Sequence, residues 1–269
     1  MSDINQKDLI ERAQRLLRQQ ADLYGPFDVD ISLKTQGIES TYTKSYTSEN
    51  SPEIQTKVEE ATNKSQVQQN NKELTTKELI SKCTTLEELR ILCEQSEELK
   101  TDLKNTNLVF GVGNSNADLM IIGEAPGEHE DKQGEPFVGA AGKLLDKIME
   151  AIDFDRSDIY IANILKHRPP NNRDPKPEER TRSLPYLIRQ IELINPKLIL
   201  CVGRVSGTTL LAKDDSLKNM RRKFHEFHGR ELMVTYHPAA LLRNSQWKRP
   251  TWEDVQLLRT RFDELKSES

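Results

Sequence analysis

The chain has 269 residues, of which 35% are hydrophobic and 30% are charged, and its formal net charge is −4. A mean hydropathy of −0.71 predicts that part of the chain stays outside a packed core. The sequence has no apolar run as long as a membrane span or signal peptide, and its three cysteines (Cys83, Cys93 and Cys201) form no CxxC pair. We therefore expect a cytoplasmic protein with no membrane contact and no disulfide framework. The net charge gives no global attraction to nucleic acid, so any such binding has to depend on local charge.

The N-terminal third predicts one helix followed by a polar linker. Apolar residues recur at three- and four-residue spacing over residues 8–24, which is typical of an amphipathic helix. Residues 36–72 are rich in Ser, Thr, Gln and Asn and cannot bury enough apolar surface to offset their ordering entropy. Two interpretations of the helix stay open: an arm that binds a protein partner, or a marginal helix that packs on nothing. The predicted division is a helix over residues 1–25, a disordered linker over 26–74 and one folded domain over 75–269.

Beyond residue 75, short apolar runs alternate with helical patterns. The helical patterns cover residues 76–82, 86–99, 142–152, 176–194 and 205–211. The strand-like runs cover residues 119–123, 159–165, 198–203 and 232–236. This alternation predicts an α/β fold, a three-layer α/β/α arrangement with a central, mainly parallel four-stranded sheet. Ligands of such sheets bind beyond the carboxyl ends of the strands, where the polar and Gly/Pro-rich segments of this chain begin.

Two loops with glycine and proline follow the first predicted strand. Residues 123–127 read Gly-Glu-Ala-Pro-Gly and place Glu124 where it can act as a general base, or where it merely hydrogen-bonds the loop backbone. Residues 133–139 contain Phe137 in a second constrained loop. Its ring can be a stacking platform for a flat ligand or a plug in the core. For each residue taken alone, both interpretations stay open.

Polar residues also follow the second and fourth predicted strands. Residues 163–175 combine Asn163, whose amide both donates and accepts, with Arg168 and Arg173, which suit phosphates. The same segment can equally be a solvated loop in which Asn163 caps the strand end. His237 ends the fourth strand, where an imidazole can stabilise a developing oxyanion, although a lone histidine is more often an ordinary hydrogen-bonded side chain.

Taken together, in this order and spacing, these segments resemble the uracil-DNA glycosylase superfamily, and within it the family-4 branch of bacteria and archaea. The resemblance runs from about Val109 to the end of the chain and also takes in residues 111–114, 178–179 and 185–187. It implies a monofunctional DNA-repair hydrolase that swings uracil out of DNA into a pocket. Hydrolysis of the N-glycosidic bond there would leave an abasic site. It implies uracil-containing DNA as a partner, and we expect a monomer.

The resemblance assigns catalytic roles to two residues. Glu124 would orient or activate the attacking water, and His237 would stabilise the negative charge that grows on uracil O2 as the base departs. Phe137 would stack on the uracil ring and Asn163 would pair with its Watson–Crick edge. The residues expected to bind the substrate are Gly123, Ala125, Phe137 and Asn163. The residues expected at the DNA surface are Arg168, Arg173, Leu241, Leu242 and Arg243, where an apolar side chain can wedge into the gap left by the flipped base.

The cofactor of the family has no matching ligands in this chain. Family-4 members usually hold a [4Fe–4S] cluster on four cysteines, whereas this chain has His167 in the Lys-His-Arg-Pro run and Ser183 before Pro-Tyr-Leu. The upstream pair is reduced to Cys93, because Ser96 and Leu99 occupy the next sites. We therefore expect no cluster, no other metal and no other cofactor.

Two further hypotheses stay open beside the enzyme. The loss of the cluster ligands is compatible with a catalytically weakened module that binds damaged DNA without turnover. A covalent uracil-trapping relative would carry an extra histidine-bearing insertion after its Lys-Arg run, and residues 169–171 continue here as Pro-Pro-Asn without one. The retention of Glu124, Phe137, Asn163 and His237 favours the enzyme.

Overall fold

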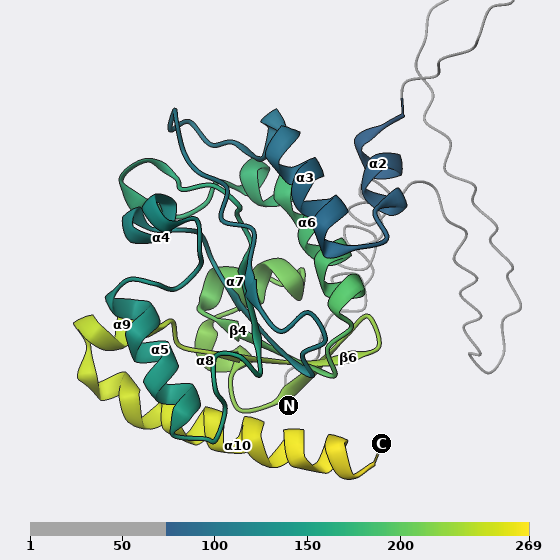
Figure 1. Ribbon diagram of the computed structural model, residues 1–269. Helices are drawn as coiled ribbons and strands as arrows, with labels where there is room; N and C mark the ends of the chain where they lie inside the picture. Colours follow the sequence, from purple (N-terminus) through teal and green to yellow (C-terminus); the bar gives the residue numbers. More distant parts are fainter. Residues whose placement is uncertain (1–73, 269) are drawn as a thin grey trace, which may run out of the picture. The chain divides into compact units, whose positions relative to one another are not determined.

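The computed structural model describes residues 74–268 (Figure 1). The predicted N-terminal helix and polar linker lie outside these residues, except for Leu74. Within residues 74–268 the strands form one six-stranded sheet in the order β1-β3-β2-β4-β6-β5. The strands are β1 (Val112–Gly113), β2 (Leu119–Gly123), β3 (Tyr160–Asn163), β4 (Leu198–Val202), β5 (Phe224–Phe227) and β6 (Arg230–Thr235).

The predicted α/β class is confirmed, but the predicted number of strands is too low. The four predicted strands are β2, β3, β4 and β6, and they pair in parallel at the centre of the sheet. Strands β1 and β5 add an antiparallel edge on each side. Neither has the apolar run of a buried strand, because β1 spans only two residues and β5 has His225 and Glu226 in its middle.

The helices that were predicted from the sequence lie close to their predicted positions. They are α2 (Thr76–Lys82), α3 (Leu86–Gln95), α4 (Glu128–Gln133), α5 (Ala140–Glu150), α6 (Pro177–Ile194), α7 (Arg204–Leu210), α8 (Leu217–Met220), α9 (Pro238–Arg243) and α10 (Lys248–Ser267). Three short 3₁₀ turns are η1 (Glu97–Leu99), η2 (Pro170–Asn172) and η3 (Ser245–Trp247). The predicted helix over 86–99 is interrupted at Ser96, and α4, α8 and α10 have no counterpart among the helical patterns predicted from the sequence.

Alternate residues of the buried strands point to opposite faces of the sheet, and each face is covered by helices. On one face Met120, Ile122 and their neighbours pack with α6, α7 and α8. On the other, Leu119, Ile121 and their neighbours pack with α5 and α10. Figure 1 shows α5 and α10 side by side, away from α6. The core therefore lies in two layers on either side of the sheet, as expected for a three-layer fold.

Helices α2 and α3 pack outside α6 and form a smaller third cluster around Tyr186 (Figure 1). Each begins with a capping box, in which Thr75 pairs with Glu78 and Thr85 pairs with Glu88. Across the part of the chain that the structure covers, no helix is long and apolar enough to cross a membrane.

Candidate active site

The carboxyl ends of β2 and β3 bring three predicted substrate residues together. Gly123 and Asn163 are neighbours in the parallel register of these strands. A Cβ atom on Gly123 would lie 2.3 Å from the Asn163 Oδ1 and 2.6 Å from the Phe137 Cζ. Side-chain carbon atoms do not approach so closely, so glycine is required here for the amide and the ring to lie against the strand. The expected group of Gly123, Phe137 and Asn163 is thus one compact cluster.

Phe137 is held by its backbone as well as by its contacts. Its φ of +55° lies in the left-handed region, which a phenylalanine adopts rarely. The Arg156 guanidinium donates to the carbonyl oxygens of Pro136 and Phe137 and fixes this turn. The ring is 4% exposed, and its centroid lies 5.5 Å from that of His237 at an interplanar angle of 30°. The aromatic ring and the imidazole therefore lie side by side.

Asn163 is 2% exposed, and its Oδ1 has no hydrogen-bond partner among the described residues. A buried amide oxygen without a donor costs free energy, so a site that keeps one is suited to a ligand that supplies the missing N–H. The interpretation of Asn163 as a simple strand cap does not account for this free oxygen.

Lys166 lies behind Asn163 and is fully buried. Its Nζ donates to the carbonyl oxygens of Asn163 at 3.2 Å and Phe110 at 3.1 Å, and to the Gln190 Oε1 at 2.7 Å. Burial lowers the pKa of Lys166 to about 8. The segment of residues 163–175 was interpreted either as a phosphate-binding loop or as a solvated loop, and Lys166 fits neither, because its ammonium is buried and holds the end of β3 in place.

His237 caps helix α9, with its Nδ1 accepting the Ala239 N–H at 3.1 Å. Burial, and next the charge of Arg243, lower the pKa of His237 to about 4. The imidazole is therefore neutral near pH 7. Because Nδ1 accepts, the single proton lies on Nε2, which makes Nε2–H a neutral donor at this site.

Glu124 follows β2 directly and is partly buried. Burial raises the pKa of Glu124 to about 7, and the nearby charge of Asp174 acts in the same direction. Arg180 and Arg204 oppose this increase. A carboxyl group with such a pKa can take up a proton near neutral pH. Ala125, the next residue, is half-buried and packs on the core below it.

Glu130 links the two loops and was not among the predicted site residues. Its Oε2 accepts the Gly127 N–H at 3.1 Å, and its Oε1 accepts the N–H groups of Val138 at 3.0 Å and Gly139 at 2.9 Å. One carboxylate thus joins the loop of Glu124 to the loop of Phe137. The only signal in the sequence is its place three residues after Gly127, at the start of α4, where an acidic capping residue is common.

The residues predicted at the DNA surface differ in exposure. Leu242 is 53% exposed and Arg243 is exposed, whereas Leu241 is 2% exposed and packs inward. Arg168 is partly buried, and its Nε donates to the Asn172 Oδ1. Leu242 is therefore the apolar side chain that α9 presents to solvent, while Leu241 holds α9 on the protein.

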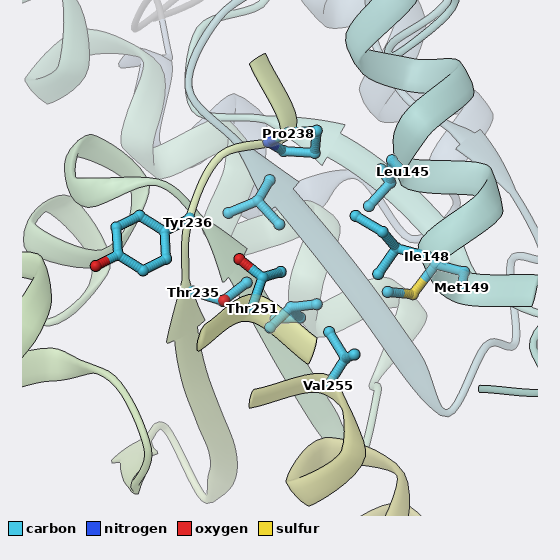
Figure 2. A pocket seen from close by; sticks show the side chains of 10 residues that line it. Leu145, Ile148, Met149, Thr235, Tyr236, Pro238, Thr251 and Val255 are labelled. Carbon is cyan, nitrogen blue, oxygen red and sulfur yellow. The ribbon is translucent and has the colours of Figure 1, made fainter. Parts of the chain in front are cut away.

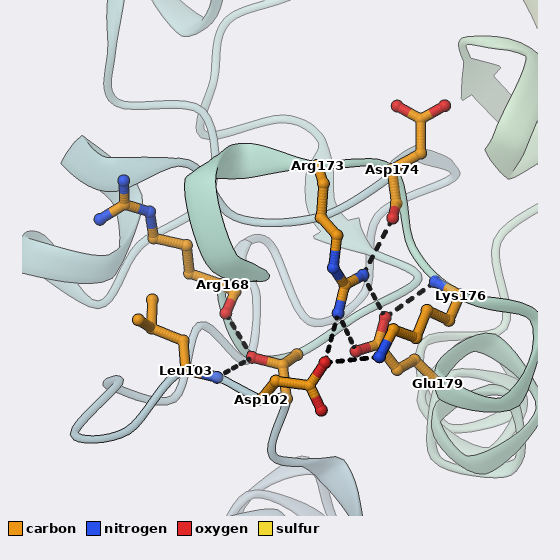
Figure 3. A network of polar contacts seen from close by, with 8 residues as sticks. Asp102, Leu103, Arg168, Arg173, Asp174, Lys176 and Glu179 are labelled. Carbon is orange, nitrogen blue, oxygen red and sulfur yellow. Dashed lines mark hydrogen bonds and ion pairs between the residues drawn. The ribbon is translucent and has the colours of Figure 1, made fainter.

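Arg173 is engaged in a network of ion pairs (Figure 3). Its guanidinium makes a two-pronged contact with Glu179, at 2.8 and 2.6 Å, and also donates to Asp102 at 3.2 Å. Asp102 also accepts from the Lys176 Nζ at 2.5 Å. The Thr101 hydroxyl donates to the Arg168 carbonyl oxygen close by. This network, which we call the loop brace, fastens residues 101–103 to the loop before α6.

The four positions that correspond to cluster ligands do not fit a [4Fe–4S] group. The Ser96 hydroxyl pairs with the Tyr186 hydroxyl at 2.9 Å, His167 Nδ1 pairs with the Thr106 hydroxyl at 3.0 Å, and Ser183 donates to the Ile164 carbonyl oxygen at 2.6 Å. Cys93 offers a thiol, but burial raises its pKa to about 12. Such a cluster needs several thiolates. Within residues 74–268, no group of three or more His, Cys, Asp or Glu side chains is placed to hold a metal ion.

A small apolar cavity lies behind Pro238, between α5, the end of β6 and α10 (Figure 2). It is lined by residues that include Leu145, Met149, Thr235 and Val255. Its volume of about 10 Å³ is at the limit for a single water molecule. The cavity is therefore a packing gap beneath the segment of His237 and Pro238, and it is too small to bind a nucleobase.

Comparisons with known proteins agree with the geometry. Residues 110–256 match the family model described as the uracil DNA glycosylase superfamily. A type-4 uracil-DNA glycosylase of Archaeoglobus fulgidus is 44% identical over 162 residues, which are 57% of this chain and 80% of that protein. One of Thermotoga maritima is 40% identical over 158 residues, 57% of this chain and 82% of that protein.

A DNA polymerase of Bacillus phage SP01 also matches, with 30% identity over 155 residues. The match covers 57% of this chain but only 17% of the polymerase. The family model spans the strands and loops that carry Glu124, Phe137, Asn163 and His237. The chain belongs to the uracil DNA glycosylase superfamily.

Proposed function

We propose that the protein is a monofunctional uracil-DNA glycosylase of DNA repair, which flips uracil out of DNA and hydrolyses its N-glycosidic bond to leave an abasic site. The observation that carries this proposal is the free, buried Oδ1 of Asn163 beside the Phe137 ring and the neutral His237. Similarity to type-4 uracil-DNA glycosylases supports the same activity. The working enzyme is a monomer and needs no cofactor.

Uracil is selected by its edge and its flat ring. The Asn163 Oδ1 accepts the uracil N3–H, and its Nδ2 donates to uracil O4. Cytosine has no N3–H and carries an amino group in place of O4, so it leaves the buried amide unpaired on both sides. Phe137 stacks on the uracil ring, and the missing Cβ of Gly123 lets the Phe137 ring and the Asn163 amide both lie against the end of β2.

His237 stabilises the departing base, and Glu124 positions the water that takes its place on the sugar. As the bond between uracil N1 and the sugar C1′ breaks, its electron pair moves into the base, and the His237 Nε2–H donates to the charge that develops on O2. Glu124 orients a water molecule toward C1′ and takes up its proton. A carboxyl group with a pKa of about 7 suits this role near neutral pH.

DNA binding depends on local groups because the net charge is −4. Leu242 fills the gap left by the flipped base, and Arg243 and Arg168 contact nearby phosphates. The guanidinium of Arg173 is already bound by two carboxylates, so we give it no phosphate contact.

The test compares abasic-site formation by the wild type and Asn163→Asp on oligonucleotides that contain either uracil or cytosine. The carboxylate lacks the amide donor that faces O4, so Asn163→Asp should lose much of its uracil preference and admit cytosine. Asn116→Asp, at an exposed position before β2, is the matched control and should behave as the wild type does. A wild type that binds DNA tightly but forms no abasic sites would contradict the proposal and favour the binding module.

A further inference from the structure

Two aromatic rings, one at each end, flank the segment that carries His237 and the exposed Leu242. Tyr236 lies immediately before His237, and Trp247 ends the 3₁₀ turn that follows α9. Their rings are stacked, with centroids 5.2 Å apart and an interplanar angle of 10°. The segment from His237 to Gln246 therefore leaves and rejoins the protein at one aromatic contact, which we call the aromatic clasp.

Arg221 fixes the clasp to the body of the protein. Its guanidinium lies over the Tyr236 ring, 4.6 Å from the centroid, and its Nε donates to the Asp254 Oδ2 at 2.6 Å. The same carboxylate oxygen accepts from the Thr235 hydroxyl at 2.5 Å. The side chains of Arg221 and Asp254 are 9% and 0% exposed, so this ion pair is not a solvated surface contact. The clasp is thus anchored on β6 and α10.

The segment between the two rings needs such an anchor. Helix α9 has six residues, and a helix of that length is not stable in water by itself. Leu241 packs inward and the His237 side chain caps the first turn, but Leu242 and Arg243 project into solvent. If Leu242 is to insert into a stack of bases, α9 has to be held rigidly on the protein.

We propose that Tyr236 and Trp247 are positioning residues that hold α9 rigid as a wedge, and that they matter most when uracil has to be extracted from a duplex. The proposal rests on the proposed glycosylase function. Stacking between aromatic rings and the cation over Tyr236 supply the holding interaction. In single-stranded DNA the base is already unpaired, so uracil release there should depend less on the wedge.

The first experiment does not depend on activity. Hydrogen exchange of the backbone amides in residues 239–246 is compared between the wild type, Trp247→Ala and Trp247→Leu. Exchange should become faster in both variants, with no change in α3, which packs on α6. Trp252, the second tryptophan of the chain, is 41% exposed on α10, and Trp252→Ala is the matched control. Unchanged exchange in the Trp247 variants would show that the stacked rings do not hold α9. Trp247→Leu keeps an apolar side chain, so exchange can still be measured on this variant if Trp247→Ala does not fold.

The second experiment measures single-turnover uracil release from double- and single-stranded oligonucleotides. Trp247→Ala should slow release from the duplex about tenfold to a hundredfold more than release from the single strand, because a small misplacement of the wedge is costly there. Trp247→Phe, which keeps a stacking ring, should restore the wild-type ratio. An equal loss on both substrates would overturn the wedge role. A wild type that is inactive on both, with the exchange result as expected, would overturn the proposed function but leave the clasp standing.

Discussion

The regions on the two sides of the loop after β3 differ in how closely their residues match the pattern of the family-4 glycosylases. On the side of Asn163, the chain has all the side chains that its resemblance to family-4 glycosylases requires, gathered at the ends of β2, β3 and β6. On the side of His167, only Cys93 matches the four cysteines of the family-4 pattern, and Ser96, His167 and Ser183 form hydrogen bonds within the protein instead. Asn163 and His167 lie four positions apart, so one short segment serves both regions. If the proposed function is correct, uracil release depends on the residues at the ends of β2, β3 and β6 and does not need a cluster on the side of His167.

The first prediction addresses the carboxylate at the rim and has the largest expected effect. Glu124→Gln removes the proton acceptor and should slow uracil release by about 10²–10⁴-fold. In the wild type the active form is the carboxylate, so the rate should rise as the pH rises through about 7. His237 is already neutral above a pKa of about 4 and adds no change in this range. The measurement is the pH profile of single-turnover release for both proteins.

A pH profile of the wild type that is flat between about pH 5 and pH 9 would contradict this assignment, because the proton acceptor would then titrate elsewhere. In Glu124→Gln the residual rate should have lost the step near pH 7. Retention of that step in the variant would show that another group causes it.

The second prediction addresses the anion stabiliser. His237→Ala should slow base release by roughly 10²–10³-fold, which is the usual cost of losing one transition-state donor. DNA affinity should hardly change, since the phosphate contacts lie elsewhere. His237→Asn keeps an acceptor at the start of α9, but its shorter side chain ends before the position of Nε2, so it separates the loss of that donor from the loss of the helix cap. Equal rates for the wild type and both variants would refute the role of His237.

The third prediction concerns the other side of the loop, where we expect an effect on stability and little on the chemistry. Arg173→Met leaves the carboxylate of Glu179, whose side chain is 4% exposed, without its guanidinium partner and with only the Lys176 N–H as a donor. The cost should be about 1–2 kcal/mol in the free energy of unfolding, and a thermal midpoint lower by about 2–4 °C for each kcal/mol. Lys132→Met, which breaks an exposed pair on α4, is the control and should have almost no effect. Weaker DNA binding with an unchanged midpoint would show that Arg173 binds phosphate instead.

Much of this arrangement follows from local sequence, and the rest depends on distant contacts. The four apolar runs predicted the parallel centre of the sheet, since buried strands are marked by their own composition. The edge strand β1 could not be predicted because two residues carry no pattern. Helix α10 was predictable in principle, because Val255, Leu258 and Phe262 repeat at helical spacing on its buried face.

In the site, the residue types and their places at strand ends followed from the sequence, but their electrostatic state did not. The partners of Arg173 include Asp102, far away in the chain. The acceptors of Lys166 come from three segments that are also distant in sequence: the segment before β1, the end of β3, and α6. The neutral state of His237 and the raised pKa of Glu124 come mainly from burial, which only the folded chain defines.

The most direct test of the central claim combines activity with metal analysis on one preparation. Protein purified without oxygen is assayed for iron and acid-labile sulfide, and its single-turnover release of uracil is measured before and after reconstitution with iron and sulfide. We predict rapid uracil release by protein with far less than stoichiometric iron, and no increase after reconstitution. Release that appears only after iron and sulfide are incorporated would contradict the account, because the replaced ligand positions would then still be needed for the chemistry at the rim.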